Sequence, residues 1–345
     1  MRICIKALDT LTFGVGKPSV WGEDTFGAGM FPPFPSVVRG AVRAAWLHEH
    51  SAFDVANTDG DPTANYAVTE YALLLNDSPH FPVPADYLWA QGENALVPCR
   101  LMDNDNLSSI TTPCQLWADA EGKLASAERR YVQREALQDY LRGNGIGRSA
   151  PLSDYVTEED RVGIFMERGQ RTAKKGMLYR SPLIRPAALG GGKSLDAVNT
   201  TSLAVSISGA DGIASLTRFG GENKVARFAE YGGEISPSGA IGEDGRFKLY
   251  LATPAVFKSG YLPELPFAAK LLSAAVYGYD SIGGFDMKAK RPKPMRRAAK
   301  AGSVFYYELI ENTPETRNGI LSLHGTSISD FSREDGFGIC YVGLV

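Results

Sequence analysis

The chain has 345 residues, a length that suits two domains better than one small core. Its 44% hydrophobic and 22% charged residues are an ordinary globular mixture, which excludes disorder of the whole chain. A net charge of −3 excludes a uniformly basic nucleic-acid-binding protein. It does not exclude a local basic surface, and local charge is what binds phosphate.

The first segments of the chain predict a strand, a long loop and a helix. Residues Arg2–Leu8 alternate apolar and polar side chains, which indicates a strand. A glycine-rich aromatic loop follows over residues 13–34, and Ser36 is the expected N-cap of a helix. We expect an exposed polar loop over His50–Thr63 and a second helix near Thr69–Leu75.

The middle of the chain predicts a domain boundary and a projecting β-hairpin. Gly143–Glu159 is rich in Gly, Ser, Pro and acidic residues, so we divide the chain into domains 1–150 and 151–345. Strand, basic tip and strand follow in turn at Arg161–Met166, Glu167–Gly176 and Met177–Ile184. The cations of this tip are Arg168, Arg171, Lys174 and Lys175.

The last third repeats the theme of the opening segments. We expect a helix over Pro266–Tyr277 and a terminal strand over Gly338–Leu344. Further strands are predicted at Ser202–Ser208, Phe247–Thr253 and Ser303–Ile310. The combination of strand, glycine-rich loop and amphipathic helix near each end indicates two α+β sandwiches of related design.

A basic loop over residues 286–302 is the strongest local signal in the sequence. Seven cations and one acid give it a net charge of +6, so the remainder of the chain carries −9. Pro292 and Pro294 are expected to hold the loop extended along a phosphate backbone. A charge run is normally a solvated surface, but this segregation favours nucleic-acid binding. The cations are Lys288, Lys290, Arg291, Lys293, Arg296, Arg297 and Lys300.

Two glycine-rich turns are weaker signals for a bound anion. Gly336 and Gly338 allow backbone N–H groups to approach a ligand closely, although such a turn before a strand is commonly structural. The start of the helix at Ser36, with Arg39 and Arg43 on one face, is a favourable phosphate seat. Aromatic side chains of the preceding loop could stack bases or equally hold the loop on the core. They are Phe13, Trp21, Phe26, Phe31 and Phe34.

Metal binding and catalysis have little support in the sequence. Cys4, Cys99, Cys114 and Cys340 form no C-x-x-C pair, so we expect free thiols in a reducing compartment, no metal and no cofactor. His324 is isolated and is expected at the surface. No apolar run has the length of a membrane span, and we expect a cytoplasmic protein that is not an enzyme.

Several motifs together resemble one family. The segment FPPFPSVVRGAVR, residues 31–43, is similar to the FPP-x-P-S-x-x-x-G-A-x-R signature of subunit three of the Cmr complex. This family belongs to the RAMP superfamily and to type III-B CRISPR effectors. The similarity continues in order through Arg161–Ile164, Gly176–Tyr179, Arg218–Glu222, Thr253–Phe257, Gly284–Asp286, Arg291–Pro294 and Ala301–Tyr307.

The resemblance implies an α+β fold of two ferredoxin-like (RRM-like) domains with long loop and hairpin insertions. It also implies a non-catalytic subunit that caps the 5′ tag of the guide RNA. Docking on the large polymerase/cyclase-like subunit and on backbone RAMP subunits is implied as well. By motif position the tip of the predicted β-hairpin is thumb-like. The expected RNA-binding residues are Lys17, Arg39, Arg43, Arg168, Arg171, Lys174, Lys175, Lys288, Lys290, Arg291, Lys293, Arg296, Arg297, Gly336, Gly338 and Gly343.

Two other functions remain open at this stage. Related RAMP proteins cut CRISPR transcripts, so the chain could be a guide-processing endoribonuclease. His48 is then the best candidate general base, although its helix offers no obvious partner. The chain could also be a structural adaptor that never contacts RNA.

Overall fold

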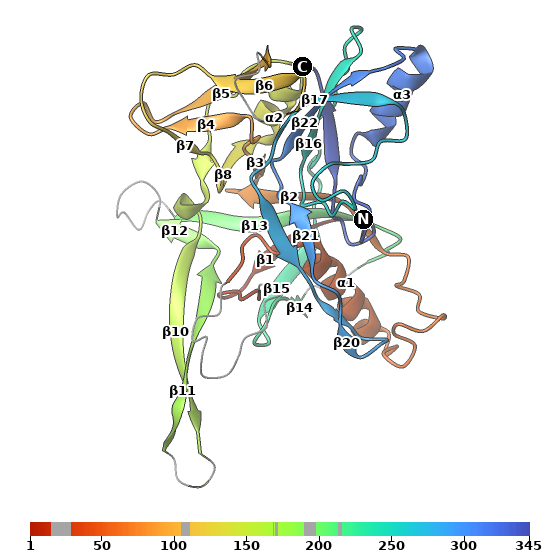
Figure 1. Cartoon of the computed structure of the whole chain (residues 1–345). Coiled ribbons are helices and arrows are strands. Elements are labelled where there is room, and N and C mark those ends of the chain that lie inside the picture. Colours follow the sequence, from red (N-terminus) through yellow and green to blue (C-terminus); the bar gives the residue numbers. More distant parts are fainter. Residues whose placement is uncertain (15–28, 105–110, 168, 170–171, 190–197, 213–215) are drawn as a thin grey trace.

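In a computed structural model the chain is built mainly from antiparallel sheets, with three α-helices among the described residues (Figure 1). The described residues are 1–14, 29–104, 111–167, 169, 172–189, 198–212 and 216–345, with the backbone alone for 173–181. The expected α+β class is therefore confirmed. No described helix has the length and apolar character needed to cross a membrane.

The first sheet has a core of four strands in the order β15, β1, β13, β2. Numbered along the chain, this order is fourth, first, third, second. The core strands are β1 (Arg2–Ala7), β2 (Ala67–Leu75), β13 (Val198–Ser208) and β15 (Val225–Glu230). The sheet is extended by β3 (Ser78–Pro82), β8 (Arg130–Gln133), β9 (Ala150–Pro151), β12 (Ala187–Leu189) and β14 (Leu216–Arg218).

The second sheet repeats that order. From β23 the strands follow as fourth, first, third, second, and every pairing is antiparallel. Its strands are β16 (Arg246–Leu251), β17 (Ala269–Ala275), β22 (Val304–Leu309) and β23 (Cys340–Gly343). Helix α1 (Pro35–Glu49) connects the first two strands of the first sheet, and α3 (Pro314–Leu323) connects the last two of the second.

The sheets do not divide the chain at residue 150. Strands β13 and β15 lie beyond that position, yet they complete the sheet that β1 begins. The two sheets also meet in one hydrophobic cluster, which contains Ile3 and Val205 from the first and Tyr250 and Tyr341 from the second, and the second sheet has a separate cluster of its own on its other face. The expected division into 1–150 and 151–345 therefore does not coincide with the division between sheets.

A smaller sheet is inserted between β3 and β8, and a helix follows β8. The sheet has the order β6, β5, β4, β7, and the sequence patterns did not predict it. Its strands are β4 (Tyr87–Ala90), β5 (Ala95–Asp103), β6 (Cys114–Ala118) and β7 (Leu124–Ser126). Helix α2 (Arg134–Leu141) follows β8 and leads to a short 3₁₀ helix at Leu152–Asp154.

The projecting hairpin predicted from the sequence is confirmed. Strands β10 (Thr157–Met166) and β11 (Ala173–Arg185) pair along most of their length and extend away from the body of the molecule (Figure 1). A second hairpin, between β17 and β22, is built from two short pairs. These are β18 (Tyr279–Ile282) with β21 (Arg296–Ala299), and β19 (Phe285–Asp286) with β20 (Arg291–Pro292).

Two predicted helices are wrong. Thr69–Leu75 lies in β2 and Pro266–Tyr277 contains β17. In β2 the last five residues are all buried, so the strand lacks the alternation that marks a half-exposed strand. The alanines of Pro266–Tyr277 favour a helix, but pairing of β17 with β22 overrides this local preference.

The start of α1 differs from the prediction, whereas several predicted strands are confirmed. The helix begins at Pro35, with Phe34 as the N-cap and no side-chain cap, so Ser36 is not the N-cap. Proline is favoured at the first helical position because its missing N–H would be unpaired there anyway. Five predicted strands are confirmed, although their ends differ by a few residues. They are Arg2–Leu8, Ser202–Ser208, Phe247–Thr253, Ser303–Ile310 and Gly338–Leu344.

Candidate nucleic-acid interface

The expected extended basic loop is a folded β-hairpin, which we call the basic hairpin (residues 279–299). Asp286 pairs with Arg291, and Ile282 pairs with Arg296, so the chain turns back on itself. Backbone pairing thus overrides the extended path expected from Pro292 and Pro294. Six cations remain exposed on it: Lys288, Lys290, Arg291, Lys293, Arg296 and Arg297.

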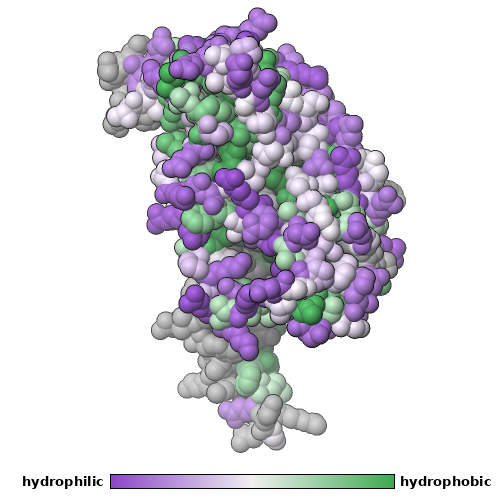
Figure 2. All heavy atoms as spheres, turned by 90° about the vertical axis from the view of Figure 1, so that its right-hand side faces the viewer, coloured by the Kyte–Doolittle hydropathy of each residue, from purple (hydrophilic) through white to green (hydrophobic). Residues whose placement is uncertain are grey.

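Few of these cations are neutralised by acids of the protein itself. Within the described residues, Lys288 has one exposed ion pair, with Asp59 at 3.4 Å, and the other five have none within 4 Å. Arg296 lies 3.6 Å from the ring centre of Phe331, which leaves its charge available. Figure 2 faces this side of the molecule, and hydrophilic side chains are numerous across the middle of the view, at the height of β20 and α1 in Figure 1.

The two arginines of α1 are occupied by the protein. Arg39 donates to the carbonyls of Tyr66 (2.6 Å) and Ala64 (2.8 Å) and pairs with Asp335 at 3.0 Å. Arg43 forms an ion pair with Asp61 at 2.6 Å, and the side chain of Asp61 is fully buried. These contacts connect α1 to the following loop and to the C-terminal turn.

Asp61 is held ionised by its neighbours. Burial alone would raise its pKa, but hydrogen bonds from Thr63, Asn57 and Arg43 lower the pKa to about 2. The loop over His50–Thr63 is thus less exposed than expected, since both Asp61 and Thr63 are buried.

The C-terminal glycines make room for the protein's own chain. A Cβ at Gly336 would lie 2.8 Å from Val68, and one at Gly338 would lie 2.5 Å from the Ser329 nitrogen. Both residues have positive φ, and their N–H groups donate to Arg333 and Pro254. Gly343 is buried in β23, where a Cβ would lie 2.9 Å from the Leu141 backbone.

Other candidate residues are placed as follows. Lys17, Arg168 and Arg171 lie outside the described residues, as do the side chains of Lys174 and Lys175. His48 is exposed on α1. His324 is not the expected surface residue, because it is half-buried and its ring contacts the Pro237 carbonyl and the Val342 N–H.

Metal ligands are likewise not gathered in one place. All four cysteines are free. In the part of the chain that the structure describes, no three His, Cys, Asp or Glu side chains are close enough to hold a metal ion.

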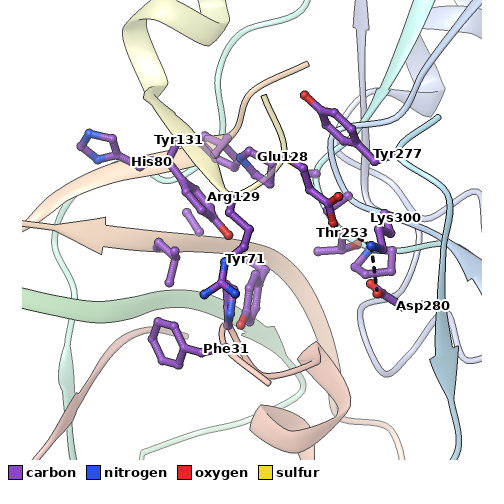
Figure 3. Close-up of a pocket in the computed structure, with 18 of the residues that line it drawn as sticks. Phe31, Tyr71, His80, Glu128, Arg129, Tyr131, Thr253, Tyr277, Asp280 and Lys300 are labelled. Atoms are coloured by element: carbon purple, nitrogen blue, oxygen red, sulfur yellow. Dashed lines mark hydrogen bonds and ion pairs between the residues drawn. The ribbon is translucent and has the colours of Figure 1, made fainter. Parts of the chain in front are cut away.

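A cavity of about 280 Å³ lies at the junction of the two sheets, and we call it the junction cavity. Its walls come from the loop before α1, from β2, β3 and β8, and from segments next to β16, β17 and β21. Figure 3 shows its labelled side chains, which are Phe31, Tyr71, His80, Glu128, Arg129, Tyr131, Thr253, Tyr277, Asp280 and Lys300. Among them, the sequence singled out only Phe31, in the aromatic loop, and Lys300, in the basic loop.

The root of the basic hairpin forms one side of the junction cavity. Lys300 directly follows β21, and its ammonium lies 2.6 Å from Glu128 and 4.0 Å from Asp280. Burial raises the pKa of Asp280, and Lys300 opposes this shift. The hairpin and the cavity are therefore adjacent parts of one surface.

Fold and site together define a mostly antiparallel α+β protein, with two sheets of equal strand order and a basic hairpin beside their junction. The family follows from the sequence, because the model of the CRISPR-associated protein family Cas_Cmr3 matches residues 3–345. The chain belongs to this family, which confirms the resemblance carried by its motifs. No curated protein matches the chain.

Three of the solved structures that match the chain have low sequence identity to it. A chain of a type III-B Cmr-beta complex bound to cognate target RNA is 18% identical to this chain. The match covers 89% of this chain and 86% of that one, with a TM-score of 0.49. In the same complex with AMPPnP the identity and coverage are equal and the TM-score is 0.50, which supports a shared fold. A chain of a type III-A Csm3–Csm4 subcomplex is 9% identical, covers 90% and 94%, and has a TM-score of 0.38.

Proposed function

We propose that the chain is a non-catalytic subunit of a type III-B CRISPR effector that holds the 5′ tag of the guide RNA. Membership of the Cas_Cmr3 family supports the assignment to such a complex. The observation that carries the RNA-binding role is the basic hairpin. Of its six exposed cations, only Lys288 forms an ion pair with an acid, Asp59, among the described residues. Phosphate contacts of this kind hold RNA and depend strongly on salt.

The proposed RNA surface excludes two groups of residues that the sequence suggested. Arg39 and Arg43 have their guanidinium groups bound to the protein. Gly336 and Gly338 have their N–H groups bound as well. Their geometry favours a structural role, with the RNA on the basic hairpin.

We also propose that the two four-stranded cores are two ferredoxin-like units. The strand order fourth, first, third, second with antiparallel pairing in each sheet supports this assignment. The first unit then extends through β15 and carries the inserted sheet and the β10–β11 hairpin. The second unit begins at β16.

Protein partners belong to the same proposal. They are the large polymerase/cyclase-like subunit and the backbone RAMP subunits, in a cytoplasmic complex. The β10–β11 hairpin supports docking, because it projects with large hydrophobic side chains exposed on β10. Among them are Val162, Ile164 and Met166, which are 46–59% exposed.

Neutralising the tip of the basic hairpin tests the RNA-binding role. The variant carries alanine at Lys288, Lys290, Arg291 and Lys293, and its affinity for a short labelled single-stranded RNA is measured over a range of salt concentrations. Affinity should fall at least tenfold at low salt, and the slope of log K against log salt should decrease by roughly 2 to 3. The RNA should remain intact.

A matched control removes equal charge elsewhere. It carries alanine at Arg100, Lys123, Arg142 and Lys270, which are exposed cations on other elements of the chain. Equal loss of affinity in both variants would contradict a role for the hairpin. Cleavage of the RNA that is lost in His48→Ala would instead support the endoribonuclease.

A further inference from the structure

The second sheet has a helix over only part of its outer face. The hydrophobic cluster on this face includes Phe247, Tyr307 and Val342. Helix α3 packs against β23, the strand at one edge of the sheet. A helix with its side chains is about 10 Å across and four strands are about 19 Å wide, so one helix covers about half of the face. Residues 252–268, which connect β16 to β17 and are all described, contain no helix, so a loop covers the other half.

This loop leaves apolar side chains partly exposed. Tyr261 is 49% exposed and Ile310, at the end of β22, is 67% exposed, while Leu265 and Phe267 are half-buried. Tyr261 lies near Tyr307, whose pKa is raised by burial and further by this neighbour. Figure 2 faces the side of the molecule on which α3 lies, and hydrophobic residues gather in the upper part of the view. A contiguous apolar patch with a polar rim is typical of a protein-binding surface.

Contacts join the loop, the end of β22 and α3 into one row. The ring centre of Phe267 lies 6.1 Å from that of Phe247 in the sheet. Phe267 also lies against α3, where a Cβ on Gly319 would be 3.4 Å from its ring. The N–H of Ile310 donates to the Ala268 carbonyl at 3.2 Å, next to Phe267. The exposed side chains therefore lie beside α3, where a second helix would cover the sheet.

Acidic side chains accompany this row. Glu264 lies within the loop, and Glu311 directly follows Ile310. Glu315 lies one turn before Gly319 on α3, so the two share a face of the helix. All three carboxylates are exposed, and none forms an ion pair with another described residue. Their charge repels the phosphates of RNA and attracts a basic protein surface.

We propose that this row binds a basic amphipathic helix of a partner protein, which lies beside α3 and completes the helix layer. The apolar stripe of that helix packs on the exposed row, and Lys or Arg side chains along its flanks pair with the carboxylates. We call the surface the acidic strip, and it consists of Tyr261, Leu265, Phe267 and Ile310 with Glu264, Glu311 and Glu315. The inference rests on the proposed function, because it takes the chain to be a subunit of a complex. It adds a contact surface separate from the β10–β11 hairpin.

Binding of the full chain to purified subunits tests the proposal. The large polymerase/cyclase-like subunit and each backbone RAMP subunit are measured singly by surface plasmon resonance. Replacing Tyr261 and Ile310 together by serine should weaken the binding of one of these subunits at least about tenfold. Both side chains are exposed, so the fold should be retained. The affinity for RNA should not change.

Charge reversal tests the acidic side chains without touching the apolar ones. Glu264→Lys, Glu311→Lys and Glu315→Lys in one chain should lower the association rate with the same subunit about tenfold at low salt, and less at high salt. The matched control carries Glu93→Lys, Asp119→Lys and Glu121→Lys, at exposed acids of the inserted sheet and its loops. This control should bind the subunit as wild type does.

Crosslinking identifies the bound segment. A photoreactive phenylalanine in place of Ile310 should capture one peptide of the partner, and mass spectrometry identifies it. The captured peptide should have an apolar stripe at helical spacing with Lys and Arg beside it. Capture of an acidic segment or of a strand would contradict the proposed occupant.

The outcomes separate this inference from the proposed function. Unchanged binding of every subunit in both strip variants would overturn the acidic strip alone. Binding of no subunit by wild type would overturn the strip and the proposed partners together. Self-association of wild type in sedimentation velocity that the strip variants lose would assign the surface to a second copy of the chain and also overturn the proposal.

Discussion

Lys248 lies where the two sheets meet and is 5% exposed. Its ammonium lies 3.4 Å from the ring centre of Tyr140. The nearby Asp86 accepts hydrogen bonds from Tyr140 and Tyr306, and its other oxygen has no partner among the described residues. Burial lowers the pKa of Lys248 to about 8 and raises the pKa of Asp86. The folded protein therefore resists charging this lysine.

The contribution of Lys248 to the stability of the protein should rise with pH above about 8. In the unfolded chain Lys248 keeps its proton up to a pKa of 10.5, so between these values the unfolded state binds more protons. The free energy of unfolding then increases by at most about 3 kcal/mol from this group. Urea denaturation of wild type and Lys248→Met on either side of pH 8 measures the effect. The rise should be absent in Lys248→Met and present in Lys270→Met, an exposed control; an equal rise in all three would refute it.

At the level of residues, the sequence predicts a cluster of charges better than it predicts which side chains line a cavity. The cations of the basic hairpin are neighbours along the chain, so their cluster could be found from the sequence alone. Tyr71, Tyr131 and Tyr277 come from three strands or loops far apart in the chain, and only the fold brings them together. Phe31 was noted because it belongs to an aromatic loop, not because of the cavity.

At the level of elements, α1 is held in place by its polar side as well as by its apolar one. Arg43 connects it to Asp61 and Thr63 in the following loop. Arg39 connects it to Asp335 beside the C-terminal turn. A buried charge left without its partner is costly, so these contacts make the helix position depend on single side chains.

Replacing Arg43 should reduce stability more than RNA affinity. In Arg43→Met the enclosed carboxylate of Asp61 loses its cation, and the free energy of unfolding should fall by about 2–4 kcal/mol. Urea denaturation measures the loss, and RNA affinity is measured where the variant is still folded. Arg142→Met, on an exposed side chain, is the control. A strong loss of RNA affinity with unchanged stability would restore Arg43 as an RNA contact.

Strands without a regular alternation of buried and exposed residues were the hardest elements to predict. Half-exposed strands such as β1 alternate in burial and could be identified. In β2 and β17 the apolar run has no such alternation, and the choice between helix and strand depends on partners distant in sequence. The small sheet of β4 to β7 was missed because three of its four strands have only three to five residues.

At the level of the whole molecule, the two sheets meet in one hydrophobic cluster, and the second sheet has a further cluster of its own. Tyr250 in the second sheet is completely buried, and its hydroxyl donates to the Pro82 carbonyl of the first sheet at 2.7 Å. Phe81 and Tyr341 contact each other across the same junction. Neither sheet can open without exposing residues of the other.

The two sheets should therefore unfold together. Amide hydrogen exchange of β1 and β13 should report the same opening free energy as that of β16 and β22, within about 1 kcal/mol. Tyr250→Ala should lower both values by about 3–5 kcal/mol. Mass spectrometry of exchanged peptides measures each sheet separately. If the substitution affected only the second sheet, the units would be independent.

The strand order of the first sheet also has a consequence for synthesis. Strand β2 ends at Leu75, but β13 begins at Val198 and β15 ends at Glu230, so the core of the sheet lacks its partners until about 155 further residues are made. At the usual rate of translation this interval lasts roughly 8–30 s. Until β13 is made, the apolar run of β2 has an unpaired edge on the ribosome. The nascent chain consequently needs shielding, by its own inserted sheet or by a chaperone, before its first half can close.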